Sequence, residues 1–389
     1  MIKILVLIDS SMEFSRRFLM GLIRYSFENG PWIFYRLPVY YKTLYGEAGI
    51  LDRIKEWEVD AVIAQWEDEE IGFLEKLQIP VFFQSYKDKN VSCSRISGDQ
   101  EAGVLAAKFF AKRKFKNFAF YGHKDFYWSK SRAEGFFHEV EKTGGNYSYF
   151  ESELLTGTKW KGSHIELDNW LTSLPKPVAL FACDDNFALQ VAEMCKVNNI
   201  NIPNDLSLLG VDNDELICNL SYPSISSIST NDETGGYNTG KMLHQLIVAK
   251  ENTPFTIEIK PIQIVLRQST EKYNISDKNI AKTVDYIIKN ITSNPTVDDM
   301  TRIVPLSRRN LEVKFKQAMG KTIYQFILDN KIEYISNMLL TTDKCLLDIA
   351  VELGFKDVRN VYRIFLKGTG YTPADFRKKN RQDDIRDSG

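Results

Sequence analysis

Residues 347–365 read LDIAVELGFKDVRNVYRIF. The pattern predicts a short helix, a tight turn and a second helix. Ala350 is small, which lets two helices approach closely, and Gly354 suits the turn between them. Val361 and Phe365 lie four residues apart, so they share one face of the second helix, which we expect to be buried. These residues therefore predict a helix-turn-helix motif.

An earlier segment, residues 297–320, has the same arrangement of two short helices around a turn. Its apolar pair is Leu311 and Phe315, again four residues apart. On the opposite side, a helical wheel turns mostly basic residues outward in both motifs: Arg309, Val313 and Lys316 in the first, Arg359 and Arg363 in the second. A helix with a buried apolar pair and a basic outer face fits the major groove of DNA. The alternative for these arginines is a helix face that contacts solvent alone.

The last hundred residues or so resemble the AraC-type DNA-binding domain, through the run quoted above and the GYTPADFR that follows at 370–377. The resemblance implies that the second helix of each motif enters a major groove on one face of double-stranded operator DNA. The first motif departs from the family pattern, because Thr301 replaces a small residue and Pro305 occupies the turn. The residues expected to contact DNA are Arg308, Arg309, Asn310 and Lys316 in the first motif and Lys356, Arg359, Asn360, Arg363 and Lys367 in the second. Among them, Arg308, Lys356 and Lys367 are expected to contact phosphates, which position the protein without reading sequence.

The distribution of charge along the chain is uneven. The 389 residues include 50 Lys and Arg against 51 Asp and Glu, a formal net charge of −1. From Ile275 to the end, however, 20 basic residues stand against 15 acidic ones, so the preceding part is acidic. A basic C-terminal part is consistent with a nucleic-acid partner, although an excess of this size also fits a solvated surface.

Residues 1 to about 270 alternate short apolar runs with amphipathic stretches, which predicts a doubly wound parallel sheet. The expected strands are Ile2–Ile8, Ile33–Leu37, Ala61–Ala64, Val81–Phe83, Asn117–Tyr121, Ala179–Ala182 and Leu206–Val211. Such sheets bind ligands beyond the carboxyl ends of their strands. We therefore expect a pocket near the residues at those ends: Asp9, Gln65, Gly122, Asp184 and Asp212.

Landmarks in this part resemble, in order and spacing, the LacI-type sugar-sensing domain, which shares its fold with periplasmic binding proteins. They include ISGDQEAG at 96–103, NFAFYG at 117–122, SRAEGF at 131–136, CDDNFA at 183–188 and SLLGVDND at 207–214. The resemblance implies an α/β sensor with two lobes, which close on a small sugar effector by a hinge motion. The first lobe is expected to hold residues 1 to about 98 and the segment that returns after about Ser229.

The residue types near the expected pocket suit a sugar. Carboxylates accept hydrogen bonds from hydroxyls, a guanidinium donates several, and an aromatic ring stacks on the C–H face. The expected effector-binding set, which the resemblance supports for the first three, is Arg132, Asp184, Asp212, Asp99, Trp128 and Arg16. For Arg132 and Asp212 the alternative is a structural salt bridge or helix cap, and for Trp128 it is a core position. Of Asp184 and Asp185, we expect one to face the ligand and the other to cap a helix.

The order of the parts, with the sensor ahead of the DNA-binding domain, resembles the bacterial xylose operon regulators. We expect a sensor at 1–270, a linker at 271–279, an AraC-type all-α domain with two helix-turn-helix motifs at 280–380, and a frayed tail at 381–389. The resemblance implies D-xylose as effector, a homodimer, and activation of pentose genes, with RNA polymerase as a further candidate partner. The residues leave open a repressor and a response to another pentose or a hexose.

Other classes of function lack their signatures. The sequence has no Gly-x-Gly-x-x-Gly, Walker or Gly-x-Ser-x-Gly motif, so we expect no catalytic site and no cofactor, and a sugar-processing enzyme is a remote alternative. Five scattered cysteines and four histidines predict no metal site. We see neither an export signal nor a membrane span, which favours the cytoplasm over a transport-type binding protein.

Overall fold

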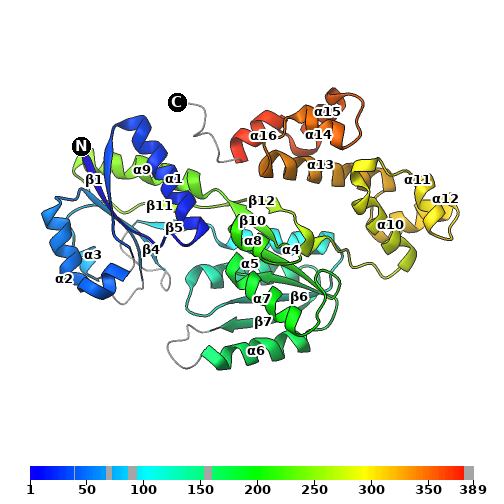
Figure 1. The fold of residues 1–389 in the computed structure, drawn as a ribbon, viewed down its shortest axis with the longest axis horizontal. Coiled ribbons are helices and arrows are strands. Elements are labelled where there is room, and N and C mark those ends of the chain that lie inside the picture. Colours follow the sequence, from blue (N-terminus) through cyan, green and yellow to red (C-terminus); the bar gives the residue numbers. More distant parts are fainter. Residues whose placement is uncertain (39, 67–71, 86–93, 153–159, 381–389) are drawn as a thin grey trace.

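The computed structural model contains two α/β lobes followed by a helical C-terminal domain (Figure 1). It describes residues 1–38, 40–66, 72–85, 94–152 and 160–380. The tail at 381–389 and Cys93 lie outside the described residues, and the other four cysteines carry free thiols. Every strand expected from the sequence is present. In the described part, no helix is long and apolar enough to span a bilayer, and no cluster of His, Cys, Asp and Glu could hold a metal ion.

The first lobe is built on a parallel sheet in the order β2-β1-β3-β4. β1 (Ile2–Leu7) is an inner strand, and Ile4 and Leu5, which point to opposite faces, are both fully buried, as a doubly wound sheet requires. α9 (Asp232–Ala249) packs along α1 (Glu13–Asn29) and so belongs to this lobe. The remaining elements are β2 Trp32–Arg36, β3 Ala61–Trp66, β4 Val81–Ser85, α2 Tyr40–Glu56 and α3 Gly72–Glu75.

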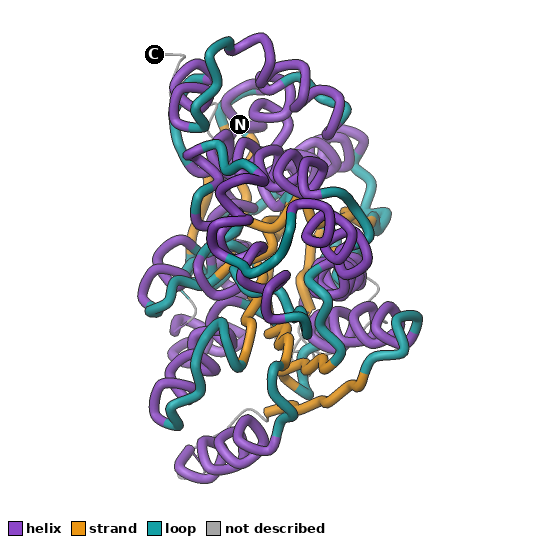
Figure 2. Tube along the Cα trace, turned by 90° about the vertical axis from the view of Figure 1, so that its right-hand side faces the viewer, coloured by secondary structure: helices purple, strands orange, loops and turns teal. Residues whose placement is uncertain are grey.

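The second lobe has a larger sheet in the order β12-β10-β9-β8-β6-β7. All pairings in it are parallel except that of β12, the antiparallel edge strand. Its strands are β6 Asn117–His123, β7 Asn146–Ser152, β8 Val178–Ala182, β9 Leu206–Val211, β10 Ser226–Thr230 and β12 Pro261–Val265. Its helices are α4 Gln100–Lys112, α5 Tyr127–Glu141, α6 Trp160–Ser173, α7 Asp185–Val197 and α8 Glu215–Leu220. Figure 2 shows helices on either side of the strands, so both faces of the sheets are covered.

The chain crosses between the lobes at 97–100, 230–232 and 258–261. Beside the first and third crossings, β5 (Arg95–Ser97) pairs with β11 (Thr256–Glu258). The third crossing corrects the expected lobe division, because only part of the segment after Ser229 stays in the first lobe and β12 returns to the second. The expectation missed it because β12 is a short edge strand with a polar residue in its middle, and such strands carry a weak apolar signal.

The C-terminal domain contains two helix-turn-helix motifs joined by a long helix. The first motif is α11 (Val297–Ile303) and α12 (Arg308–Met319), and the second is α14 (Leu346–Glu352) and α15 (Val358–Thr369). Figure 1 shows α13 (Ile323–Thr341) running between them. Each motif has its own apolar cluster, one around Phe315 and the other around Phe365. The domain is completed by α10 Lys278–Lys289 and α16 Pro373–Asn380.

The segment between sensor and DNA-binding domain is held at both ends. The short helix η3 (Gln268–Thr270) is pinned to the second lobe, where the Ser269 hydroxyl donates to the Leu208 carbonyl at 2.6 Å. Within the expected linker, Tyr273 packs into the apolar cluster of the first motif. Few residues therefore separate the attachment to the second lobe from the attachment to the C-terminal domain.

Candidate functional site

Arg132 forms the centre of the candidate effector site, and it is 6% exposed on α5. Its Nη1 donates to the carbonyl of Cys183 at 2.6 Å. Its Nη2 donates to Asp99 at 3.3 Å and lies 3.6 Å from Asp212 Oδ1. The guanidinium also sits over the ring of Trp128, 4.9 Å from its centroid. The structure thus brings together four of the six residues expected to bind the effector.

Asp212 is the first residue after β9, and its backbone is unusual. Its φ is +93°, and the next residue, Asn213, has a φ of +50°. Residues with a Cβ seldom adopt this region, and where they do, surrounding contacts hold them there. Here the Asp212 N–H donates to Ile228 O at 2.9 Å, and the Asn213 N–H donates to the Ser227 hydroxyl at 2.9 Å. The strained corner aims the Asp212 carboxylate toward the guanidinium.

Asp184 and Asp185 have different partners. Asp184 caps α7, since its Oδ1 accepts the Phe187 N–H at 2.8 Å. Asp185 Oδ2 accepts the Asp214 N–H at 2.7 Å and so holds the loop after β9. Burial, together with the charge of Asp212, raises the pKa of Asp184 to about 7 and raises that of Asp185 as well. The cap of the pair is therefore Asp184, and a ligand contact by either carboxylate stays a prediction.

The site holds more acceptors than donors. Asp99, Asp184 and Asp212 surround one guanidinium, and burial raises the pKa of the nearby Asp232 to about 7. Sequence reasoning missed Asp232, which enters from α9 of the other lobe. Among the described residues, Arg132 Nε and Asp212 Oδ1 have no hydrogen-bond partner. A neutral ligand with several hydroxyls would supply both missing partners, because each hydroxyl donates and accepts.

Arg16, on α1 of the first lobe, has a guanidinium that is already engaged, and effector binding by it stays a prediction. It donates to Glu13 at 2.7 Å and to Asp214 of the second lobe at 2.9 Å. Its neighbour Arg17 donates to the carbonyl of Asn213 at 3.1 Å. These contacts, which the sequence did not predict, join the two lobes across the crevice.

Trp128 lies at the edge of the second lobe's core, beside Arg132. Its ring stacks on Phe126 at 5.2 Å between centroids, and Phe126 stacks on His123 at 4.0 Å. Trp128 is also partly buried against the apolar core of the second lobe. The ring therefore supports Arg132 from the core side, and stacking on a sugar stays a prediction.

In the C-terminal domain, the expected division between inner and outer helix faces is confirmed. Leu311, Phe315, Val361 and Phe365 are each fully buried. The residues expected to contact DNA are all exposed: Arg308, Arg309, Asn310, Lys316, Lys356, Arg359, Asn360, Arg363 and Lys367. They lie on or next to α12 and α15. Their contact with DNA stays a prediction.

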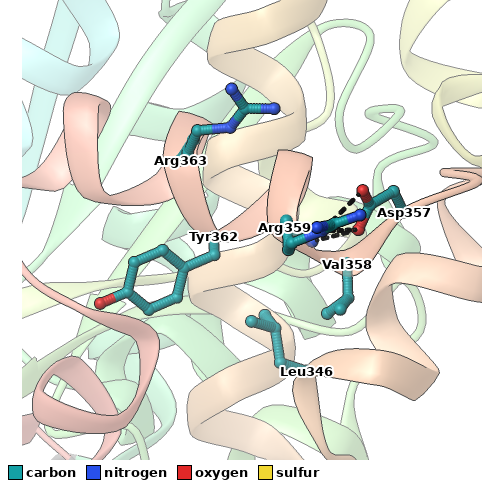
Figure 3. A pocket seen from close by; sticks show the side chains of 6 residues that line it. All are labelled: Leu346, Asp357, Val358, Arg359, Tyr362 and Arg363. Atoms are coloured by element: carbon teal, nitrogen blue, oxygen red, sulfur yellow. Dashed lines mark hydrogen bonds and ion pairs between the residues drawn. The ribbon is translucent and has the colours of Figure 1, made fainter.

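The second motif has a groove of about 730 Å³ beside α15 (Figure 3). Asp357 caps the helix by accepting the Arg359 N–H at 2.8 Å, and its carboxylate also holds Arg359 Nε at 2.9 Å. Figure 3 shows that Tyr362 and Arg363 extend away from this pair. Sequence reasoning missed Tyr362, which is 40% exposed and adds an aromatic surface next to Arg363.

Arg308, at the start of α12, is less available than its exposure suggests. Its side chain pairs with Asp298 and with Glu312, each at 3.2 Å. Both pairs are exposed, so each contributes little to stability and can be exchanged for a phosphate. The assignment of Arg308 to a phosphate contact remains a prediction on these grounds.

The sensor and the C-terminal domain are in direct contact. Arg113, 5% exposed after α4, donates to Thr270 O at 3.2 Å and reaches Glu333 of α13 at 3.3 Å. Asn337 of α13 donates to the Leu266 carbonyl at 3.3 Å. Two cavities, of about 600 and 380 Å³, lie along this junction. The sequence did not single out Arg113, because its role depends on residues far away in the chain.

Comparison with known proteins supports both the sensor and the C-terminal domain. Residues 107–270 match the family of periplasmic binding protein-like domains, and residues 300–379 match a helix-turn-helix domain family. The chain is also 30% identical over 337 residues to the xylose operon regulatory protein of Haemophilus influenzae, covering 84% of this chain and 87% of that protein. The chain belongs to the family of xylose operon regulatory proteins. It is therefore a sugar-responsive, DNA-binding transcription regulator and not an enzyme.

Other members and structures agree with this family. The xylose operon regulatory protein of Escherichia coli K12 is 28% identical over 345 residues, which are 85% of this chain and 87% of that protein. A solved structure of a xylose-binding transcription activator covers 97% of this chain and 98% of its own, with 24% identity and a TM-score of 0.60. This likeness confirms the expected fold class, a two-lobed sensor followed by an all-α domain with two helix-turn-helix motifs.

Proposed function

We propose that this regulator is a homodimer that binds D-xylose in the crevice between its lobes, acts in the cytoplasm, and activates genes for pentose use. The observation that carries the proposal is the surplus of buried carboxylates around Arg132, on a chain that also exposes two basic helices. The xylose operon regulators that the chain resembles support D-xylose in particular. Residues 1–270 would form the sensor and 280–380 the DNA-binding domain.

Calorimetry of the full chain with D-xylose, L-arabinose, D-ribose and D-glucose tests the effector. We expect D-xylose to bind most tightly and to raise the melting temperature, because a ligand that binds the folded state stabilises it. Asp212→Asn should weaken binding strongly, since the amide replaces one acceptor by a donor. Binding of another sugar in place of xylose would select the alternative effector, and binding of none would contradict the sensor site.

For DNA, we propose that each protomer reads two successive major grooves with α12 and α15, and that the dimer occupies direct-repeat half-sites. Footprinting of the full chain on DNA selected from a random pool would map the bound segments. Sedimentation of the complex would give the number of protomers. A transcription assay with RNA polymerase then separates an activator from a repressor, because an activator with xylose should raise transcript levels above those of the same reaction without the protein, whereas release of a repressor can only restore that level.

The response to sugar is proposed to travel through the corner at Asp212. Next to Asp212, the Asn213 side chain accepts a hydrogen bond from Arg267 Nη2 at 2.9 Å. Leu266, the residue before Arg267, accepts a hydrogen bond at its carbonyl from Asn337 of α13. A ligand that moves Asp212 on lobe closure would thereby move the attachment of the C-terminal domain. Binding of sugar and DNA should then be reciprocal, each tightening the other by the same factor.

A further inference from the structure

Lys331, near the middle of α13, is buried to an extent that is rare for lysine. It is 6% exposed, and no carboxylate lies within ion-pair distance of it among the described residues. Burial lowers the pKa of its ammonium group. An ammonium removed from water costs several kcal/mol unless hydrogen bonds replace the water. Its acceptors therefore indicate what the side chain does.

One acceptor of Lys331 lies just ahead of the first helix-turn-helix motif, and the other lies in the turn of the second. Its Nζ donates to Asn294 Oδ1, two residues ahead of the cap of α11, and to the Leu353 carbonyl in the turn of the second motif at 3.5 Å. The ammonium also lies 4.3 Å from the centre of the Phe355 ring. One side chain on α13 therefore joins the second motif to the segment that leads into the first.

Asn294 makes a second hydrogen bond between the same two segments. Its amide Nδ2 donates to the Gly354 carbonyl at 2.8 Å. Both residues have left-handed backbones, with φ of +52° at Asn294 and +67° at Gly354. A Cβ at position 354 would lie 2.2 Å from Asn294 Nδ2, so glycine is required for this approach.

We propose that Lys331 and Asn294 are positioning residues that fix the second motif relative to the first, and thereby set the spacing between the DNA segments that α12 and α15 read. The apolar clusters of the two motifs both pack on α13, with Tyr334 at the edge of each, and the hydrogen bonds of Lys331 and Asn294 add a polar link between the second motif and the segment before the first. A tilt would pull Asn294 or Leu353 away from the ammonium and leave that charge buried without partners. The resulting cost makes the arrangement stiff.

This inference rests on the DNA-binding function above. It predicts that DNA affinity depends on the spacing between the two DNA segments that α12 and α15 read. Inserting one base pair between the segments read by α12 and α15 displaces them by about 3.4 Å and rotates them by about a tenth of a turn. For the wild-type protein on DNA selected from a random pool, we expect a loss of about tenfold or more in affinity. For Lys331→Met and Asn294→Gly, the loss on insertion should fall to about threefold or less. Lys321→Met removes a surface lysine near the same helix and should behave as wild type.

A second measurement does not need DNA. Spin labels on encoded amino acids at Gln317 of α12 and Leu366 of α15 report the distance between the two helices, and both positions are exposed. We expect a narrow distance distribution in the wild type and a broader one in both variants. Failure of the wild type to bind DNA would refute the proposed function but not this connection. Equal insertion penalties and equal distribution widths in folded variants would overturn the inference.

Discussion

Arg132→Met should destabilise the sensor in a manner that depends on pH. The change keeps an apolar side chain of similar length and removes the charge that faces Asp99 and Asp212 and the donor to the Cys183 carbonyl. Deleting one partner of a buried ion pair costs about 3–5 kcal/mol, and a residue that is 6% exposed qualifies for this range. We expect that loss at pH 8, which lies above the pKa of about 7 of the nearby Asp184.

The direction in which pH changes the stability loss of Arg132→Met follows from the pKa values of the nearby buried carboxylates. Burial raises the pKa of Asp184 to about 7 and raises that of Asp212, and the charge of Arg132 opposes both shifts. A carboxyl whose pKa is raised on folding contributes stability below its unfolded pKa, near 3.8, and loses it as pH rises through its folded pKa. Removing Arg132 raises the folded pKa further, so the deficit of the variant should shrink by about 1 kcal/mol or more between pH 8 and pH 5.5.

Urea unfolding of the full chain, followed by circular dichroism at pH 8 and pH 5.5, measures both quantities. Arg53→Met breaks an exposed pair with Glu56 and should cost less than about 0.5 kcal/mol at either pH. Adding Asp212→Asn to Arg132→Met should restore part of the stability at pH 8, because it removes an uncompensated charge. A deficit of the same size at both pH values, or no recovery in the double variant, would refute the reasoning.

Three further predictions concern the rest of the molecule. Arg363→Ala should weaken specific DNA binding by about 1–3 kcal/mol and relax the preference at one base pair, whereas Lys356→Ala should weaken all sequences alike; gel shifts on selected and scrambled DNA distinguish them. Gly354→Ala should lower the unfolding free energy by about 1–3 kcal/mol, because of its positive φ and the contact with Asn294, and a melting curve would show this. Arg267→Met should leave sugar binding intact but bring the sugar–DNA coupling factor close to one; titrations with and without DNA that match wild type would exclude this route.

The strand ends at the site were predictable from sequence, because local signals mark them. Apolar runs that end in Asp184 and Asp212 identify buried strands, and Arg132 opens a segment with helical spacing just after another such strand. The periodicity of the second motif likewise placed Val361 and Phe365 inside. In each case the signal is an apolar run or a helical spacing, which involves only residues close together in the chain.

What sequence could not predict depends on residues distant in the chain. The pairing of Arg16 with Asp214 joins positions 198 residues apart, and Asp232 reaches the site only because the chain crosses between lobes before α9. The role of Arg113 requires the C-terminal domain to dock on the second lobe. No periodicity or local propensity contains that information, since it arises from the assembled tertiary structure.

A ligand favours a closed state only through bonds to both lobes, since a bond to one lobe alone forms equally in an open state. The contacts that already join the lobes come from two partly exposed arginines: Arg16 pairs with the buried Asp214, and Arg17 donates to the Asn213 carbonyl. Asp232 lies at the start of α9, where the chain crosses between the lobes, and burial together with the charge of Asp212 raises its pKa to about 7. A ligand whose hydroxyls donate to ionised carboxylates gains about 1.5–3 kcal/mol from each such hydrogen bond, and the bonds that it makes to the first lobe exist in the closed state alone. Two or three such bonds are enough to shift the population and, through the linker, the DNA-binding domain.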